Sequence, residues 1–492
     1  MRIRQPIARL LGAGAIGRLA GDSVLYGLGT ALGRVFQIAL VPILTRVFSP
    51  AEYGVVDLVM TVSVLATMIT VSGMDAALAR SFYEAPDTES RRRKATTSAI
   101  HRLVFGTLMG GLVILFARPL STVLLDSPSY VKYVRILGLA IPFSSFYLIA
   151  NEALRVTFQP AKYIGLNALN MALVGALTLW FVLVLKYSVA GVFWARVLSD
   201  AITALAGLIL LRHTLTRKGG TLTDLKSMLA YGAPLLPVTF IYYVLTYADR
   251  QILLRFGMLA SVGIYAVAVK VAAPLLIAVT AFQLAWGPSA FAAAERPDHP
   301  RVFSRVLDLY VAGATTLALV VGLLAPELVR LFAPRPYWGA AQATGLLALA
   351  TVAQGAYQIA ALGVNLARKN YWLIVTTGLA AIVTVGLGIL LVRRWGVTGV
   401  AWATLIGFSL STIFLYLKSQ SLRPFPYRGL ACLGLFGLAA GIESTTAWTG
   451  FSVGGLIVRT ALMIGFALVA WRFVLAGRGR VANPAPQPVE AL

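Results

Sequence analysis

Fourteen apolar stretches, each long enough to cross a bilayer as a helix, follow one another along this chain with short connections between them. About 20 mainly apolar residues span the hydrocarbon core, and lipid offers the backbone no hydrogen bonds, so such a chain has to fold as a helical bundle. The stretches cover residues 23–45, 55–76, 99–117, 135–154, 163–185, 188–211, 229–248, 260–284, 306–329, 341–366, 371–392, 396–417, 429–448 and 451–475. The sequence therefore predicts an all-α polytopic membrane protein with about 14 transmembrane helices.

A repeated heptapeptide shows that most of the chain is duplicated. Residues 189–195 return as residues 397–403, identical at five of seven places, and Gly54 aligns with Gly263 at nearly the same offset. Six spans in each copy is an even number, so both copies insert with the same orientation. The repeat predicts two parallel six-helix lobes with a cavity between them, an arrangement typical of transporters.

The expected organisation follows from the repeat. It comprises a cytoplasmic interfacial segment (1–22), an N-lobe with helices 1 to 6 (23–214), a C-lobe with helices 7 to 12 (215–425), two further helices (426–477) and a disordered cytoplasmic tail (478–492). The glycines of the third span, Gly106, Gly110 and Gly111, predict a surface for close helix packing.

The net charge of +24 is interpreted through its position along the chain. Lys and Arg concentrate in the N-terminal tail and the even-numbered connections, so the positive-inside rule places both termini in the cytoplasm. The basic run 91–94 is interpreted as a topology signal and a contact for anionic lipids, not as a nucleic-acid site.

Enzyme and metal chemistry have little support in the sequence. The single Cys432 excludes a disulfide within the chain, and three scattered His residues form neither a metal cluster nor a catalytic triad. The connections are too short for a soluble catalytic domain. We therefore expect no enzyme activity, no catalytic residue, no cofactor and no metal.

Two cations lie deep in the predicted spans. Arg34 stands halfway along the first span with Gln37 on the same side, and Lys270 stands near the middle of the eighth. A charge at the bilayer centre costs about 2.5–3.5 kcal/mol on insertion scales, so such residues usually mark pathways. Arg34 and Lys270 each either belong to a structural ion pair buried between helices or face the cavity, where they would bind an anionic, phosphorylated substrate.

Other polar groups lie within or at the ends of spans. Asp57 and Asp75, at the two ends of the second span, are candidates for coupling to a returning proton or sodium ion, and that coupling stays open. Gln354 and Gln358 are one turn apart on the tenth span, where they either line a polar wall or hydrogen-bond neighbouring helices.

Several short motifs occur in a characteristic order. They are Ser49 to Gly54, Tyr231 to Pro237, Asp249-Arg250, Gly263 to Tyr265, Lys270 and Trp286-Gly287-Pro288. Each motif is weak alone. In this order, and with fourteen spans, the chain resembles Wzx-type polysaccharide and O-antigen flippases, the polysaccharide transporter branch of the multidrug/oligosaccharidyl-lipid/polysaccharide exporter superfamily. The resemblance extends over helices 1 to 12.

The resemblance implies a function and a location. It implies that undecaprenyl-diphosphate-linked oligosaccharide moves from the inner to the outer leaflet of the bacterial inner membrane by alternating access, for O-antigen, capsule or exopolysaccharide biosynthesis. By position, Arg34 and Lys270 match the family's cavity cations. Asp249 and Arg250 match its second-lobe motif, where Arg250 either contacts substrate or takes a structural role at the outer gate.

The resemblance also implies partners, and it leaves alternatives. The expected partners are the lipid-linked anionic oligosaccharide, membrane lipids, and a polysaccharide polymerase with chain-length machinery, and nucleic acid is not expected. A multidrug cation antiporter of the same superfamily would need cavity acids instead of cations. A lipid-linked cell-wall precursor flippase shares the cationic cavity, and a membrane scaffold for polysaccharide synthesis would not need the deep Arg34 and Lys270.

Overall fold

The computed structural model describes residues 36, 38–216, 219–293, 299–445 and 452–478, and these residues form helices without any β-strand. Eleven helices of this described part are long and apolar enough to cross a membrane. The shorter apolar helix Ile38–Val47 overlaps the end of the first predicted span, most of which lies outside the described residues, and Gly429–Ser444 falls within the thirteenth. The predicted all-α polytopic membrane fold is confirmed.

The longest helix, α16 (Tyr371–Leu422), contains two predicted spans. Its backbone leaves the helical region at Gly396, where φ is 50°, so the helix is broken between the stretches 371–392 and 396–417. A left-handed φ costs glycine little because it has no Cβ. The predicted pair of spans therefore corresponds to two helical segments joined at a glycine.

The chain forms two compact units, which are described separately. Unit 1 comprises residues 1–270, 333–337 and 389–400, and unit 2 comprises residues 271–332, 338–388 and 401–492. These units reflect packing, whereas the predicted lobes reflect the internal repeat. The lobe boundaries near residues 214 and 425 are not tested by the packing and stay a prediction.

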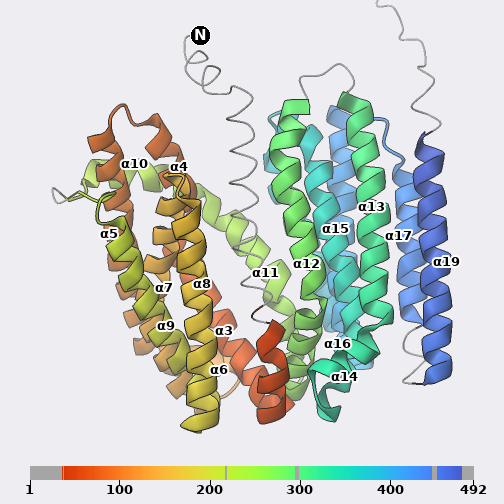
Figure 1. The fold of residues 1–492 in the computed structure, drawn as a ribbon, viewed down its shortest axis with the longest axis horizontal. Helices are drawn as coiled ribbons and strands as arrows, with labels where there is room; N and C mark the ends of the chain where they lie inside the picture. Colours follow the sequence, from red (N-terminus) through yellow and green to blue (C-terminus); the bar gives the residue numbers. More distant parts are fainter. Residues whose placement is uncertain (1–35, 37, 217–218, 294–298, 446–451, 479–492) are drawn as a thin grey trace, which may run out of the picture. The chain divides into compact units, whose positions relative to one another are not determined.

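Unit 1 is built largely from the first half of the chain (Figure 1). Its helices are α3 (Pro50–Val71), α4 (Met74–Glu84), α5 (Thr88–Leu115), α6 (Ala117–Leu125), α7 (Val131–Val156), α8 (Pro160–Leu179), α9 (Ser188–Leu211), α10 (Leu222–Gly232), α11 (Leu236–Arg255) and the first part of α12 (Leu259–Ala293). Helix α7 lies against both α5 and α9, so it forms the centre of this bundle.

The start of α3 follows directly from its sequence. Ser49 caps the helix: its hydroxyl accepts from the Glu52 amide at 3.3 Å, while the Glu52 carboxylate accepts from the Ser49 amide at 2.9 Å. This reciprocal capping box satisfies two amides that the helix cannot, and Pro50 at the first helical position needs no amide partner. The Ser49 to Gly54 motif thus sets where α3 begins.

Glycine allows the close packing of α5 on α7. A Cβ at Gly110 would lie 2.6 Å from the Gly138 carbonyl oxygen, and one at Gly106 would lie 3.1 Å from the Ser145 Cβ. Gly111 has open space instead. Two of the three glycines predicted to form a packing surface therefore contact a neighbouring helix.

Two predicted spans are interrupted in the structure. The second span breaks at Ser72 and Gly73, which both have positive φ, so Asp75 lies in the first turn of a new helix, α4, instead of ending the span. The seventh breaks between α10 and α11, where Pro234 lacks the amide that a continuous helix needs. Gly73 and Gly232 meet at these breaks, since a Cβ on Gly73 would lie 2.3 Å from the Gly232 carbonyl oxygen.

Unit 2 is centred on α13 (Figure 1). Its helices are the remainder of α12, α13 (His299–Leu323), α14 (Ala325–Phe332), α15 (Ala341–Leu366), most of α16, α17 (Gly429–Ser444) and α19 (Val453–Arg478). Helix α13 contacts α15, α17 and α19. The two helices that follow the internal repeat thus pack on a helix of its second copy.

Candidate functional site

Lys270 is the only charged residue in the 35 residues of α12. It stands at the middle of the candidate span Leu259–Gln283, where its side chain is half-buried. It interacts electrostatically with Asp57 of α3 and with Arg250 of α11. The structure therefore brings together three polar residues that the sequence singled out in separate spans.

Arg250 is held by two carboxylates. Its Nη1 lies 2.8 Å from Oδ1 of Asp249 and its Nε lies 3.1 Å from Oδ2 of Asp57, with a further bond from Nη1 to the Thr246 carbonyl oxygen. The Arg250 side chain is 7% exposed and that of Asp249 is 5% exposed. These partners offset part of the desolvation of the buried cation, and the removal of any one charged member would leave an uncompensated charge.

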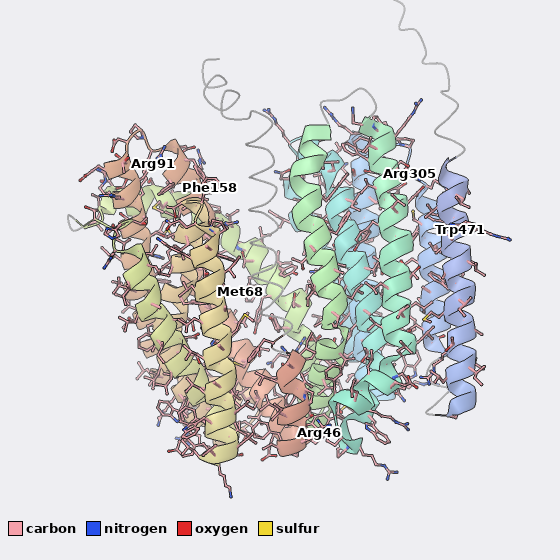
Figure 2. All side chains as sticks on the ribbon, viewed as in Figure 1. Arg46, Met68, Arg91, Phe158, Arg305 and Trp471 are labelled. Carbon is pink, nitrogen blue, oxygen red and sulfur yellow. The ribbon has the colours of Figure 1, made fainter. Side chains whose placement is uncertain are left out.

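Two aromatic rings complete the surroundings of Arg250. The rings of Tyr247 and Tyr265 each lie 5.2 Å from the guanidinium carbon, within the range of cation–π attraction. Arg91, by contrast, is exposed at an end of the unit 1 helices (Figure 2). The charged cluster, defined as Asp57, Asp249, Arg250 and Lys270, thus contains two acids and two bases within the membrane-spanning part of unit 1.

Helices α3 and α12 cross closely beside this cluster. A Cβ on Gly54 would lie 2.6 Å from the Leu259 carbonyl oxygen, and a Cβ on Gly263 would lie 1.9 Å from the Pro50 carbonyl oxygen. At the offset of 209, Gly54 corresponds to Gly263 and Pro50 to Leu259. The contact is therefore reciprocal, as at a two-fold axis, so equivalent residues of the two repeats meet at this point.

The structure places Asp75 in a separate ion pair. Asp75 pairs with Arg102 of α5, whose side chain is fully buried, whereas the Asp75 side chain is 40% exposed. Because this pair is bonded to neither Arg250 nor Lys270, Asp75 is not part of the charged cluster. It contributes instead to the packing of α4 on α5.

Four predicted site residues remain. Arg34 and Gln37 fall outside the described residues. On α15, Gln354 is half-buried and Gln358 is exposed, in unit 2. Whether these two glutamines line a polar wall stays a prediction.

Sequence reasoning missed several buried charged residues, three of which are at most 2% exposed. Arg102 and Arg459 are among the largest fully buried side chains of the described chain, and Glu443 is 2% exposed. All three lie inside predicted spans, so the criterion that singled out Lys270, a charge within an apolar stretch, could have identified them as well. Among the described residues, no group of three or more His, Cys, Asp or Glu is placed to hold a metal ion.

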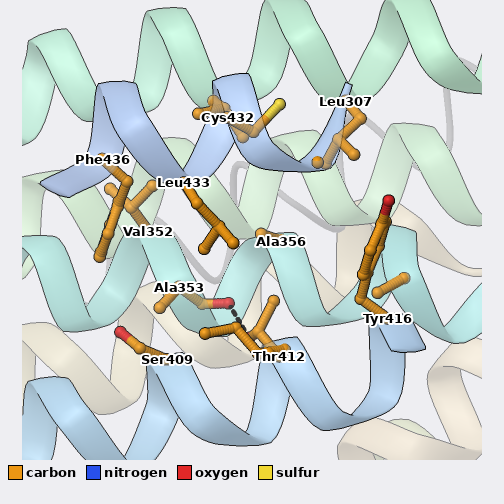
Figure 3. A pocket seen from close by; sticks show the side chains of 14 residues that line it. Leu307, Val352, Ala353, Ala356, Ser409, Thr412, Tyr416, Cys432, Leu433 and Phe436 are labelled. Atoms are coloured by element: carbon orange, nitrogen blue, oxygen red, sulfur yellow. Dashed lines mark hydrogen bonds between the residues drawn. The ribbon is translucent and has the colours of Figure 1, made fainter. Parts of the chain in front are cut away.

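An apolar pocket lies in unit 2, formed by α13, α15, α16 and α17 (Figure 3). Its lining includes Leu307, Val352, Leu433 and Phe436, while the Thr412 hydroxyl is turned away from solvent to donate to the Ala353 carbonyl oxygen at 2.7 Å. Such a lining suits an aliphatic chain and offers no charged group to an ion.

Two sequence comparisons identify relatives. The family model of "Polysaccharide biosynthesis protein" matches residues 19–292, more than half of the chain. The succinoglycan biosynthesis transport protein ExoT of Rhizobium meliloti (strain 1021) is 33% identical over 135 residues. This match covers 26% of the present chain and 24% of the relative, so it spans about a quarter of that protein.

Solved transporters share the fold. The lipid II flippase MurJ, in an inward closed conformation, has a TM-score of 0.71 at 11% identity, covering 93% of this chain and 100% of that chain. An inward-facing multidrug resistance MATE family transporter of the MOP superfamily has a TM-score of 0.64 at 16% identity, covering 80% and 97% of the two chains. The fold is that of these membrane transporters, and the chain belongs to the polysaccharide biosynthesis protein family.

Proposed function

We propose that the protein moves an oligosaccharide linked to undecaprenyl diphosphate from the inner to the outer leaflet of the bacterial inner membrane by alternating access. Both termini then face the cytoplasm. The observation that carries this proposal is Lys270, the only charged residue of the long apolar helix α12, in a chain of the polysaccharide biosynthesis family.

The charged cluster suits a diphosphate group. A phosphate oxygen that approaches the Lys270 ammonium competes with the Asp57 carboxylate for it. Asp57 also accepts from Arg250, so it keeps a cationic partner when Lys270 turns to the phosphate. The cluster can therefore release one positive charge to substrate without leaving a buried carboxylate unpaired.

The membrane potential favours movement in the proposed direction. The free energy of a negative charge falls by about 2.3 kcal/mol per 100 mV when it moves outward across a membrane whose inside is negative. A diphosphate carries about two such charges if they cross unneutralised. Lys270 neutralises part of the diphosphate charge while the substrate is bound. The free energy that the potential contributes therefore depends on whether the lysine moves with the substrate.

The names of the similar proteins support this class of substrate. One relative is a succinoglycan biosynthesis transport protein, and one structural neighbour is a lipid II flippase. A multidrug transporter shares the fold as well. The cation at the middle of α12 favours an anionic substrate over a cationic drug.

The test uses the full chain in proteoliposomes that contain a fluorescent undecaprenyl-diphosphate oligosaccharide. We expect the wild type to move this lipid between leaflets, Lys270→Ala to abolish movement, and Lys270→Arg to retain part of it because the charge remains. Arg34→Ala is expected to act in the same direction as Lys270→Ala. The matched control is Lys132→Ala, since Lys132 is exposed.

Parallel vesicles distinguish the alternative functions. One set carries a lipid-linked cell-wall precursor and another carries a fluorescent organic cation. Transport of either compound without movement of the undecaprenyl-diphosphate oligosaccharide would overturn the proposal, as would normal movement of the oligosaccharide by Lys270→Ala.

A further inference from the structure

Three aromatic side chains, Phe240, Tyr243 and Tyr247, form a row along one face of α11. They are spaced by three and four residues, which places them on the same side of the helix. The rings of Phe240 and Tyr243 are stacked with their centroids 6.4 Å apart, and the centroids of Tyr243 and Tyr247 lie 5.0 Å apart. The three residues, called the aromatic row below, therefore form one continuous surface of rings.

The aromatic row ends at the charged cluster of unit 1. Arg250 is the next residue on the same face of α11, and its guanidinium carbon lies 5.2 Å from the ring centroid of Tyr247. The Tyr243 hydroxyl donates to the Thr61 carbonyl oxygen of α3 at 3.2 Å, one helical turn from Asp57. The rings thus continue directly from the residues to which we assign the diphosphate.

The aromatic row is accessible along its length. Phe240 is 54% exposed, and Tyr243 and Tyr247 are half-buried. Tyrosines of membrane proteins usually gather in belts at the two interfaces, near the ends of a span. Phe240 and Tyr243 lie instead near the middle of the candidate span Leu222–Arg255. An interfacial belt therefore does not account for the row.

We propose that the aromatic row binds the sugars nearest the diphosphate of the substrate, with the C–H face of each sugar ring packed on an aromatic ring. A sugar ring presents apolar C–H groups between its hydroxyls, so it matches a ring surface that also carries tyrosine hydroxyls. The first sugar is joined directly to the diphosphate. A diphosphate at Lys270 therefore brings that sugar to the end of the row at Tyr247.

The inference rests on the function proposed above and names the residues that hold the sugar part of its substrate. The undecaprenyl chain, attached to the other end of the diphosphate, fits the aromatic row less well. That chain has no hydrogen-bonding group, so it would gain nothing from the hydroxyls of Tyr243 and Tyr247. The tyrosines therefore favour the sugars as the occupant.

The first measurement is binding to the purified full chain in detergent, followed by fluorescence anisotropy of two labelled lipids. One is undecaprenyl-diphosphate glucose, and the other is undecaprenyl diphosphate without a sugar. Glucose is chosen because its equatorial hydroxyls leave C–H groups on both faces of the ring. We expect Phe240→Leu and Tyr243→Leu to weaken binding of the glucose lipid by about 3- to 10-fold and to leave binding of the sugar-free lipid unchanged.

Two further variants serve as controls. Tyr243→Phe keeps the ring and loses only the hydroxyl, so it should bind the glucose lipid more tightly than Tyr243→Leu does. Tyr187→Leu removes a tyrosine that is 50% exposed just before α9, away from the aromatic row, and it should bind both lipids as the wild type does.

The two lipids separate the possible outcomes. Equal weakening of both by the leucine variants, as expected if the rings hold the undecaprenyl chain or only stabilise the fold, would overturn the proposal. Unchanged binding of the glucose lipid in both leucine variants would overturn it as well, as would a wild type that binds neither lipid.

Movement of the same two lipids between the leaflets of proteoliposomes is measured separately. Selective loss of glucose-lipid binding in a protein that moves neither lipid supports the aromatic row and contradicts the transport function. A wild type that moves both lipids, with leucine variants that slow neither, contradicts the aromatic row and leaves the transport function standing.

Discussion

The two units hold buried charge in different ways. In unit 1, Arg250 is enclosed by two carboxylates and two tyrosine rings. In unit 2, Glu443 lies against the glycine backbones of α13 and α15. The described neighbours of Arg250 are charged groups and aromatic rings, whereas those of the Glu443 carboxyl group include the backbones of two helices. Removal of a charged partner should therefore destabilise unit 1 most, whereas a methyl group added beside Glu443 in unit 2 meets the end of a flexible side chain and should cost less.

The largest effect is expected for Arg250→Ala. This change leaves Asp249 and Asp57 buried without their shared guanidinium, which costs about 3–5 kcal/mol of stability. Thermal unfolding of the purified protein in detergent measures the loss. Arg255→Ala is the control, because Arg255 and its partner Asp126 are both more than half exposed. Equal stability of the two variants would contradict the view that pairing stabilises unit 1.

A smaller effect is expected where α3 crosses α12. In Gly263→Ala the added methyl group would overlap the Pro50 carbonyl oxygen, a backbone atom that cannot turn aside, so overpacking costs about 1–3 kcal/mol. The same unfolding measurement applies. Gly313→Ala provides a matched control, since a Cβ there meets open space. A tolerated Gly263→Ala would argue against the close reciprocal contact of the two repeats.

A still smaller effect is expected in unit 2. The methyl group of Gly345→Ala would meet the end of the flexible Glu443 side chain, which can shift, so we expect a cost of about 1 kcal/mol. The double variant Gly345→Ala/Glu443→Ala should show a smaller loss than the sum of the two single variants. Strict additivity would indicate that the two residues do not touch. Gly434→Ala serves as the control because its surroundings are open.

The smallest effect is expected for an exposed charge outside the spans, which shows how little a solvated charge contributes compared with the buried ones. Asp87 caps α5 by accepting from the Ser90 amide at 2.7 Å, and this bond lowers the pKa of its carboxyl below the usual 3.8. The bond therefore stabilises the helix start above that pH and is lost as the pH falls through the lower folded value. Hydrogen exchange at the start of α5 should speed up in Asp87→Ala at neutral pH and converge with the wild type in strong acid.

Much of the helical architecture was predictable from local sequence. The apolar stretches matched helices along the described chain, the capping residues Ser49 and Glu52 marked the start of α3, and Gly396 separated two predicted spans. The breaks at Ser72 and Pro234 were not predicted, since both stretches remain apolar across them. Hydropathy indicates whether a segment can lie in lipid, but it does not indicate where the helix within that segment breaks.

At the candidate site, too, the sequence predicted some of the residues but not their contacts. Position within or at the end of an apolar stretch made Lys270 and Asp57 candidates, because a charge in such a stretch is costly in lipid. Asp249 and Arg250 were candidates through the family resemblance. Their partners could not be read in this way, since Asp57 and Arg250 are 193 residues apart. Likewise, the sequence does not show that the Glu443 carboxyl group lies beside glycines of two other helices.

By itself, the sequence determined that the chain spans a membrane as helices, that it is duplicated, and which charges lie within its spans, because these properties depend on composition and spacing along one segment. The tertiary structure alone decided that Arg250 is paired, that Asp75 belongs to a separate pair with Arg102, and that Gly54 meets its own counterpart, Gly263. These outcomes depend on distances between helices, and such distances arise only when side chains from remote segments compete for the same space.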